Sequence, residues 1–314
     1  MDIKNVLFAF AGLSMAVLFG YHAYHGANPE WHEYQRTYYG MLADKMGDPT
    51  LANAPLKIEQ VWLPTVNNRA DRCTTCHKGI GNPLFKDAPQ PFTTHPEMFD
   101  ADNKGTGYII KHPFPKFGCT VCHEGDPQAL TVEATHGNVH HLDRELLTGH
   151  FTESSCSKCH QDLYARRVEM PEASTLMAGK ALFKSKGCGA CHTAKQMKTK
   201  GTAGPELSGF GSKTELSFYL VHNFHHVEGE HTKLQWEWEH FKDPQKITPG
   251  DPHADPPQPP TIMPNFGLSD EETDQLTTFM LSFKDDAKEA IPMNYLSKYP
   301  PIPERKKRKK MASQ

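Results

Sequence analysis

The sequence predicts a mainly α-helical protein with much irregular structure: an N-terminal transmembrane helix, then a compact middle domain, then a C-terminal domain. Three observations predict this organisation. An uncharged apolar run lies near the N-terminus, and the pattern Cys-x-x-Cys-His occurs four times. Only 37% of the residues are hydrophobic, with 25 prolines and 23 glycines, which is little apolar material for the cores of a 314-residue chain. Such a length suits two or three small domains.

Residues 1–27 are expected to form the membrane anchor. The run from Val6 to Gly20 is uncharged and follows Lys4; extended through Ile3 and Tyr24, it approaches the roughly 20 residues that cross a bilayer. A cleaved signal peptide is the alternative, but no convincing small-x-small cleavage site follows the run. We therefore expect a single-pass helix in the cytoplasmic (inner) membrane.

Residues 28–70 are expected to hold an amphipathic helix and a linker. Asn28 suits the N-cap, Pro29 suits the first helical position, and Gly47 followed by Asp48-Pro49 marks the end. One helical face carries Trp31, Tyr34, Tyr38 and Leu42. This aromatic face either covers the protein's own middle domain or docks on a membrane subunit, and the sequence leaves both open.

The four Cys-x-x-Cys-His motifs use all eight cysteines of the chain. This spacing is typical of covalent c-type haem attachment, in which two thiols bind the porphyrin edge and the histidine ligates the iron. A disulfide, a thioredoxin-like pair or a zinc site would not need a histidine after the second cysteine of every motif. The attachment residues are Cys73, Cys76, Cys119, Cys122, Cys156, Cys159, Cys188 and Cys191, and the proximal ligands are His77, His123, His160 and His192.

The motifs therefore predict four haem c groups with iron. Each buried porphyrin would supply apolar surface that the short helices and loops lack. Because this attachment takes place outside the cytoplasmic membrane, the haem domains are expected on its periplasmic side. Nucleic acid is not an expected partner there.

Residues 71–170 hold three of the motifs, too closely spaced for a separate globular fold around each. Each iron needs a sixth ligand, and the 19 histidines of the chain include many candidates. Any one of them could instead be a surface residue or bind a propionate. The candidates between the motifs are His95, His112, His136, His140, His141 and His150.

Part of this region resembles a known family. His95-Pro96, His112-Pro113, the run from Phe117 to Gly125 and Thr135-His136-Gly137 resemble membrane-anchored multihaem c-type cytochromes that accompany b-type quinol-oxidising subunits in bacteria. The resemblance covers roughly residues 20–165. It implies His95, His112 and His136 as distal ligands of three bis-histidine haems, without saying which serves which iron. It also implies a cytochrome b-type partner and possibly an iron–sulfur subunit.

Residues 171–285 read as a monohaem domain. Ser174 can cap a helix that carries Leu176, Leu182 and Phe183 and leads to Gly187-Cys188. Gly204-Pro205 follows the motif, Thr261 to Phe266 contains a methionine loop, and Ser269 with Glu272 has capping-box spacing before a closing helix. These features resemble class I cytochrome c. The resemblance implies that the carbonyl of Pro205 orients the proximal histidine and that Met263 is the sixth ligand.

An insertion at residues 222–260 departs from that resemblance. It is rich in histidine and tryptophan: His225, His226, His231, Trp236, Trp238 and His240. It is expected to be a structural flap or a partner-binding loop, with a metal site as a weaker alternative. A histidine from this insertion could also replace Met263 as the iron ligand.

Mixed ligation suggests a direction for electrons, because methionine ligation raises the haem potential relative to bis-histidine ligation. We expect electron transfer from a quinol-oxidising partner through three bis-histidine haems to the Met263 haem, and then to a soluble cytochrome or a terminal oxidase. The chain would be a non-catalytic subunit of a quinol:cytochrome c oxidoreductase-type complex. The alternatives are an independent anchored quinol dehydrogenase and, less favoured, a catalytic multihaem reductase. The remaining residues, 286–314, form a proline-containing tail with the basic run Arg305–Lys310.

Overall fold

The computed structural model describes residues 2–63, 69–96, 98, 111–139, 144–165, 170–214, 217, 224–253 and 256–285. The tail at residues 286–314 and two substitute ligands, His140 and His141, lie outside these ranges. By its internal contacts the chain divides into two compact units: residues 1–60 with 72–105, and residues 61–71 with 106–314. The proposed division into a trihaem domain at 71–170 and a monohaem domain at 171–285 stays a prediction.

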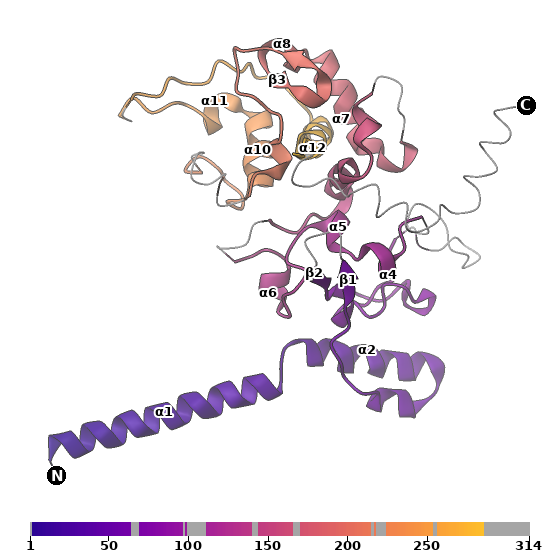
Figure 1. Ribbon diagram of the computed structural model, residues 1–314, viewed down its shortest axis with the longest axis vertical. Coiled ribbons are helices and arrows are strands. Elements are labelled where there is room, and N and C mark those ends of the chain that lie inside the picture. The colour runs from indigo at the N-terminus through magenta and orange to yellow at the C-terminus, as the bar shows by residue number, and fades with distance from the viewer. Residues whose placement is uncertain are drawn as a thin grey trace, which may run out of the picture. The chain divides into compact units, whose positions relative to one another are not determined.

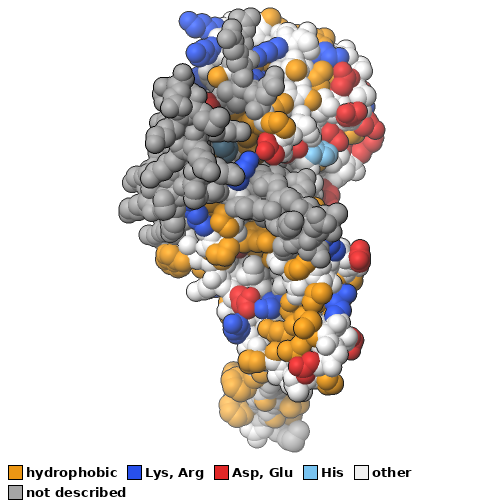
Figure 2. Space-filling model, turned by 90° about the vertical axis from the view of Figure 1, so that its right-hand side faces the viewer, with side chains coloured by type: hydrophobic (Ala, Val, Ile, Leu, Met, Phe, Trp, Pro, Cys, Tyr) orange, Lys and Arg blue, Asp and Glu red, His pale blue; other side chains and the backbone are white. Residues whose placement is uncertain are grey.

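The first unit begins with the helix α1 (Ile3–Ala27), in which no residue is buried. Among the described residues, one helical segment is long and apolar enough to cross a membrane, and it starts here. Figure 2 shows hydrophobic side chains gathered at the lower end of the view, where the N-terminal helices lie. This exposed apolar helix supports a single-pass anchor.

Asn28 ends α1 and does not cap the next helix, which corrects the sequence-based expectation. Both its backbone amide and its side-chain amide donate to the carbonyl of Tyr24, about one turn back. The helix α2 (Trp31–Met46) starts after Glu30 and ends, as predicted, at Gly47 with a left-handed φ of 64°.

The aromatic face of α2 packs on its own chain. Tyr38 stacks on Phe85 with ring centroids 4.7 Å apart, and both are buried together with Phe92. Trp31 is also buried, with 7% of its surface exposed. Of the two roles left open for this face, the structure favours covering the protein's own haem-motif segment.

The second unit starts with short elements. The strands β1 (Val61–Leu63) and β2 (Arg69–Asp71) pair antiparallel, with Trp62 opposite Ala70. The helices α4 (Phe114–Phe117), α5 (Thr120–His123) and α6 (Val132–Thr135) have four residues each. A 3₁₀ segment, Gly149–Lys158, leads into the third motif. This irregular architecture agrees with the predicted fold class.

The C-terminal part of the second unit has a helical core. The helices α7 (Ser174–Ser185) and α12 (Asp270–Leu281) pack together, and α10 (Lys233–Lys242) packs on the other side of α12 (Figure 1). Phe183, Phe279 and Phe283 meet in edge-to-face contacts with centroids 5.0–5.8 Å apart. At the crossing, a Cβ on Gly179 would lie 1.9 Å from the carbonyl oxygen of Gln275, so only glycine allows this approach.

Two helix starts can be compared with their expectations. The capping box of α12 is confirmed: Ser269 accepts from the Glu272 amide, and the Glu272 carboxylate accepts from the Ser269 amide. Ser174, in contrast, is the first residue of α7 and not its cap. The carboxylate of Glu153 accepts from the Leu176 amide instead, from 23 positions upstream in the chain.

Smaller elements complete the domain. The helix α8 (Cys188–Cys191) is followed by the strands β3 (Thr193–Ala194) and β4 (Thr199–Lys200), which pair antiparallel. The insertion contributes α10 and the one-turn helix α11 (Pro244–Ile247).

Candidate haem-binding sites

All four Cys-x-x-Cys-His motifs form the same local structure. In each, the backbone amide of the histidine donates to the carbonyl of the first cysteine, as in one turn of α-helix. The N···O distances are 2.9 Å at His77, 3.0 Å at His123, 2.8 Å at His160 and 3.0 Å at His192. The turn holds both cysteines and the histidine of a motif in one compact backbone conformation, and covalent attachment and axial ligation require these three side chains close together.

The eight cysteines are free, and none is in a disulfide. Burial raises the pKa of Cys76 to about 11 and that of Cys159 to about 11, and it raises the pKa of Cys156 to about 12. At neutral pH these groups are therefore thiols.

The fourth motif shows how a proximal histidine is oriented. The Nδ1 atom of His192 lies 2.8 Å from the carbonyl oxygen of Pro205. Because a carbonyl only accepts, Nδ1 carries the proton and Nε2 keeps the lone pair that binds a metal. A Cβ on Gly204 would lie 2.4 Å from Cε1 of His192, so a glycine lets this segment approach the ring. The arrangement fits an axial haem ligand.

The second motif is held at both ends. The carboxylate of Asp71 accepts from the amides of Cys119 and Thr120, at 2.8 and 2.9 Å, and so caps α5. His123 Nδ1 donates to the carbonyl of Leu147 at 2.9 Å, which again leaves Nε2 available. The backbone of His136 is bonded to Leu146, the residue before Leu147, because the His136 carbonyl accepts from the Leu146 amide.

The third motif lies beside a predicted distal ligand. The rings of His160 and His112 have centroids 6.2 Å apart and an interplanar angle of 72°. Two imidazoles on opposite sides of one metal hold their nitrogens about 4 Å apart and their ring centres roughly 6 Å apart. The observed pair fits this spacing. The structure therefore brings the rings of His112 and His160 together, while their ligation of one iron stays a prediction.

The first motif lies in the other unit and is braced by α2. Gln35 is fully buried: its side-chain amide donates to the carbonyls of Lys57 and Thr75, at 2.7 and 2.9 Å, and Thr75 lies inside the motif. The predicted ligand His95 belongs to the same unit, where its amide donates to the Ile80 carbonyl, three residues after His77. Its Nδ1 lies 2.5 Å from the carbonyl oxygen of Pro96, so the proton is placed on Nδ1 here too.

The last substitute ligand, His150, lies beside α12. Its Nε2 lies 3.4 Å from a carboxylate oxygen of Asp274 on α12. Its ring packs against Phe151 at 4.3 Å. This position fits a structural contact with the C-terminal domain.

The methionine loop is held by the insertion. The Asn265 side chain donates to the Lys242 carbonyl at 3.1 Å, and the Thr261 amide donates to the Thr248 carbonyl at 3.0 Å. Gln245 also donates to the carbonyl of Met263. The described part of the insertion therefore supports the loop that carries the predicted sixth ligand, which fits a structural flap, while a partner-binding role stays a prediction.

One comparison with known proteins bears on this domain. A family model described as cytochrome c matches residues 176–284. These residues form a cytochrome c domain. Neither a curated protein nor a solved structure shows significant similarity to the chain. A cytochrome c domain implies covalently bound haem c with iron, and it supports a role in electron transfer for this part of the chain.

A buried ion network joins the second motif, the third motif and the cytochrome c domain. Glu124, which follows His123 directly, is paired with Lys158 at 2.8 Å, Arg144 at 2.8 Å and Lys284 at 3.0 Å. Lys158 lies between the cysteines of the third motif and also donates to the carbonyl of Val121, between those of the second. The two motifs are thus directly connected through side chains.

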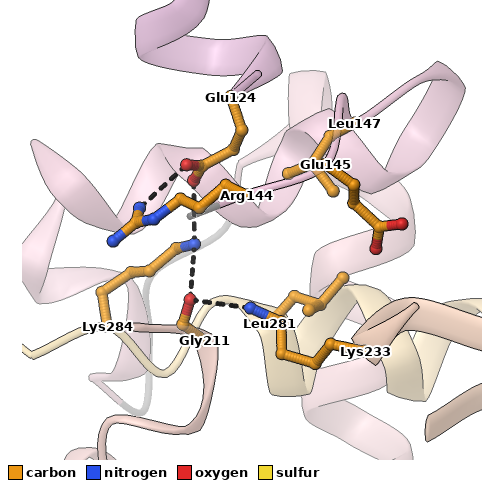
Figure 3. Close-up of a pocket in the computed structure, with 8 residues that line it drawn as sticks. All are labelled: Glu124, Arg144, Glu145, Leu147, Gly211, Lys233, Leu281 and Lys284. Atoms are coloured by element: carbon orange, nitrogen blue, oxygen red, sulfur yellow. Dashed lines mark hydrogen bonds and ion pairs between the residues drawn. The ribbon is translucent and has the colours of Figure 1, made fainter. Parts of the chain in front are cut away.

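The close-up in Figure 3 shows part of this network around the Gly211 carbonyl, which accepts from Lys284 at 3.1 Å and from Lys233 at 3.4 Å. Burial alone would raise the pKa of Glu124, but the charges of Lys158, Lys284 and Arg144 outweigh burial and hold it well below its usual range. Glu124 is therefore an anion at neutral pH. It has a φ of 60°, an uncommon conformation for a residue other than glycine.

Sequence reasoning missed Glu124, Lys158 and Asp71. Two signals were visible in the sequence: Lys158 lies inside the third motif, and Glu124 directly follows the second. Their partners, however, lie far along the chain: Lys284 is 160 residues from Glu124. Spacing alone cannot identify such contacts.

Proposed function

We propose that this protein carries four covalently bound haem c groups and transfers electrons along them. The observation that carries the proposal is the shared backbone turn of the four motifs, with N···O distances of 2.8–3.0 Å. One of these turns lies in the cytochrome c domain, whose family binds haem. The other three motifs have the same backbone hydrogen bond as that one. When bound, the haem irons supply reversible one-electron transfer.

The chain's own residues would hold and tune these groups. Pro205 and Leu147 fix the tautomers of His192 and His123 through their carbonyls, and such supporting contacts orient metal ligands. His112 with His160 forms one bis-histidine pair, while His95 and His136 are the proposed distal ligands of the remaining two. Met263 is the proposed ligand in the cytochrome c domain.

The direction of transfer follows from the ligands. Bis-histidine haems have lower potentials than a histidine–methionine haem. Electrons would therefore move toward the cytochrome c domain and leave from it to a soluble cytochrome or a terminal oxidase. The ion network at Glu124 supports a route into that domain, because it joins the second and third motifs to it.

The proposed electron source is a quinol-oxidising membrane complex with a cytochrome b-type subunit, possibly with an iron–sulfur subunit. The exposed apolar helix α1 supports a location in the cytoplasmic membrane, and the haem domains would lie on its periplasmic side. The complex, and not this chain alone, would carry the quinol:acceptor oxidoreductase activity.

Purification in mild detergent tests the proposed partner. We expect a b-haem band in the reduced-minus-oxidised spectrum, together with a multi-span membrane subunit identified by mass spectrometry. A pure c-haem spectrum with no co-purifying subunit would contradict this part of the proposal and favour an independent anchored carrier or quinol dehydrogenase.

A further inference from the structure

The insertion places a histidine against the predicted iron ligand of the cytochrome c domain. The Nε2 atom of His240 lies 3.2 Å from the sulfur of Met263. These residues are 23 positions apart and come from α10 and the methionine loop. The contact therefore arises from the way the insertion folds back onto this loop.

The ring of His240 is held in this direction by its own helix. It stacks on Trp236, one turn earlier in α10, with centroids 4.7 Å apart and an interplanar angle of 8°. Trp236 itself is only 6% exposed. The helix is fixed in turn to α12, because the Trp238 indole donates to Asp274 at 2.8 Å and Lys242 pairs with Asp270 at 2.8 Å.

Both side chains are of a kind that binds haem iron. A thioether and an imidazole are each found as axial ligands, and they differ in the potential that they give. Sulfur is a weak hydrogen-bond acceptor, so a hydrogen bond alone is a small reason to direct an imidazole at it. An imidazole nitrogen 3.2 Å away is, in contrast, already directed at the place of the sulfur.

We propose that His240 is a reserve axial ligand of the cytochrome c domain, which takes the sixth position when the Met263 thioether is lost. The inference rests on the proposed haem at Cys188 and Cys191. The exchange replaces one iron–sulfur bond by one iron–nitrogen bond. It transfers no electron, and it transfers no proton when the imidazole is neutral and protonated on Nδ1.

The consequence is a single site with two potentials. With Met263 bound, the domain is the high-potential end of the proposed chain. With His240 bound, its potential falls toward those of the bis-histidine haems. The insertion then has a role that neither a flap nor a partner-binding loop explains.

The test uses the full-length protein in detergent, in the variants Met263→Ala, Met263→Ala/His240→Phe and Met263→Ala/His231→Phe. Carbon monoxide is the probe, because it binds reduced haem iron only where an axial position is open. In Met263→Ala, the iron of the cytochrome c domain is expected to stay low-spin and not to bind carbon monoxide, and the potential of this haem is expected to be lower than in the wild type. The double variant lacking His240 should bind about one carbon monoxide per chain, while the matched His231 control should behave like Met263→Ala.

Two results would overturn the proposal. If Met263→Ala binds carbon monoxide as fully as the double variant, His240 does not ligate. If the double variant lacking His240 stays closed, another residue is the reserve ligand. Haem content and the mass of the peptide containing Cys188 to His192 are measured in every sample, including the wild type. Absence of haem from the wild-type peptide would refute the proposed function, which separates that failure from a failure of the ligand assignment.

Discussion

The cytochrome c domain and residues 111–165 hold haem motifs in different ways. In the domain, Leu176, Phe183, Phe279 and Phe283 are 0–2% exposed and form a core between two helices of 12 residues. In residues 111–165, the described α-helices have four residues each, and Val121 belongs to a small apolar cluster with Leu63. Leu147 and Leu163, from the second region, are buried in the core of the domain. The first region is held by apolar packing between its own helices, whereas the second depends on that shared core, on its ion network and on the proposed covalent groups.

Removal of one covalent attachment should give the largest difference in stability between the two regions. In Cys119→Ala/Cys122→Ala, the second motif would lose its proposed haem, and the segment around it should lose its fold, because Val121 and Leu63 form only a small apolar cluster there. In Cys188→Ala/Cys191→Ala, the core around Phe279 should preserve much of the helical structure. Limited proteolysis with mass mapping of the cut sites, together with far-ultraviolet circular dichroism, measures the difference. Equal protease sensitivity of both variants in their own regions would break the comparison.

Loss of the central carboxylate should come next in size. Glu124→Gln leaves Lys158 and Lys284, which are 8% and 5% exposed, without their anion. Breaking a buried ion pair costs about 3–5 kcal/mol of unfolding free energy. Denaturant unfolding followed by haem absorbance measures this cost.

The matched control is Glu206→Gln, which removes an exposed pair with Lys195 at 3.5 Å. Exposed pairs contribute about 0–1 kcal/mol. If both variants lose equally little stability, the network does not hold the region together.

The helix crossing gives a test inside the cytochrome c domain. In Gly179→Ala the new Cβ would lie 1.9 Å from the Gln275 carbonyl oxygen, so α7 and α12 must move apart. We expect a loss of about 1–3 kcal/mol, as for other overpacked sites. Gly40→Ala in α2 is the control, since nothing lies within 4 Å of its Cβ; it should gain about 0.5–1 kcal/mol. A neutral Gly179→Ala would show that this crossing is not tightly packed.

The smallest expected effect depends on pH. Burial raises the pKa of Glu237 on α10 well above its usual range, and the charges of Lys233 and Lys213 only partly oppose this. The folded state therefore binds the proton more tightly than the unfolded state, and stability falls as pH rises from the unfolded pKa, about 4.3, toward the folded pKa. Glu237→Gln should remove this slope and be more stable by roughly 1 kcal/mol near neutral pH. Thermal unfolding at pH 4 to 8 tests it, and parallel curves for both proteins would contradict the argument.

The sequence predicted the features that depend on local pattern. Cys-x-x-Cys-His spacing, the apolar run of α1, the glycine end of α2 and the Ser269–Glu272 capping box each involve residues within a few positions of one another. Asn28 and Ser174 were assigned as N-caps incorrectly. Asn28 donates back to Tyr24 at the end of α1, and the distant carboxylate of Glu153 accepts from the Leu176 amide in place of Ser174. Residues whose role comes from distant partners, such as Asp71, Glu124 and Lys158, could not be found from spacing.

Haem stoichiometry tests the central claim most directly. Intact-protein mass spectrometry, with a haemochrome assay on the same full-length sample, counts the covalent groups. A redox titration then assigns their potentials. The account predicts four haem c groups per chain, three at lower potential and one clearly higher. A single haem, located at Cys188 and Cys191, would contradict it and leave only the cytochrome c domain as a haem protein.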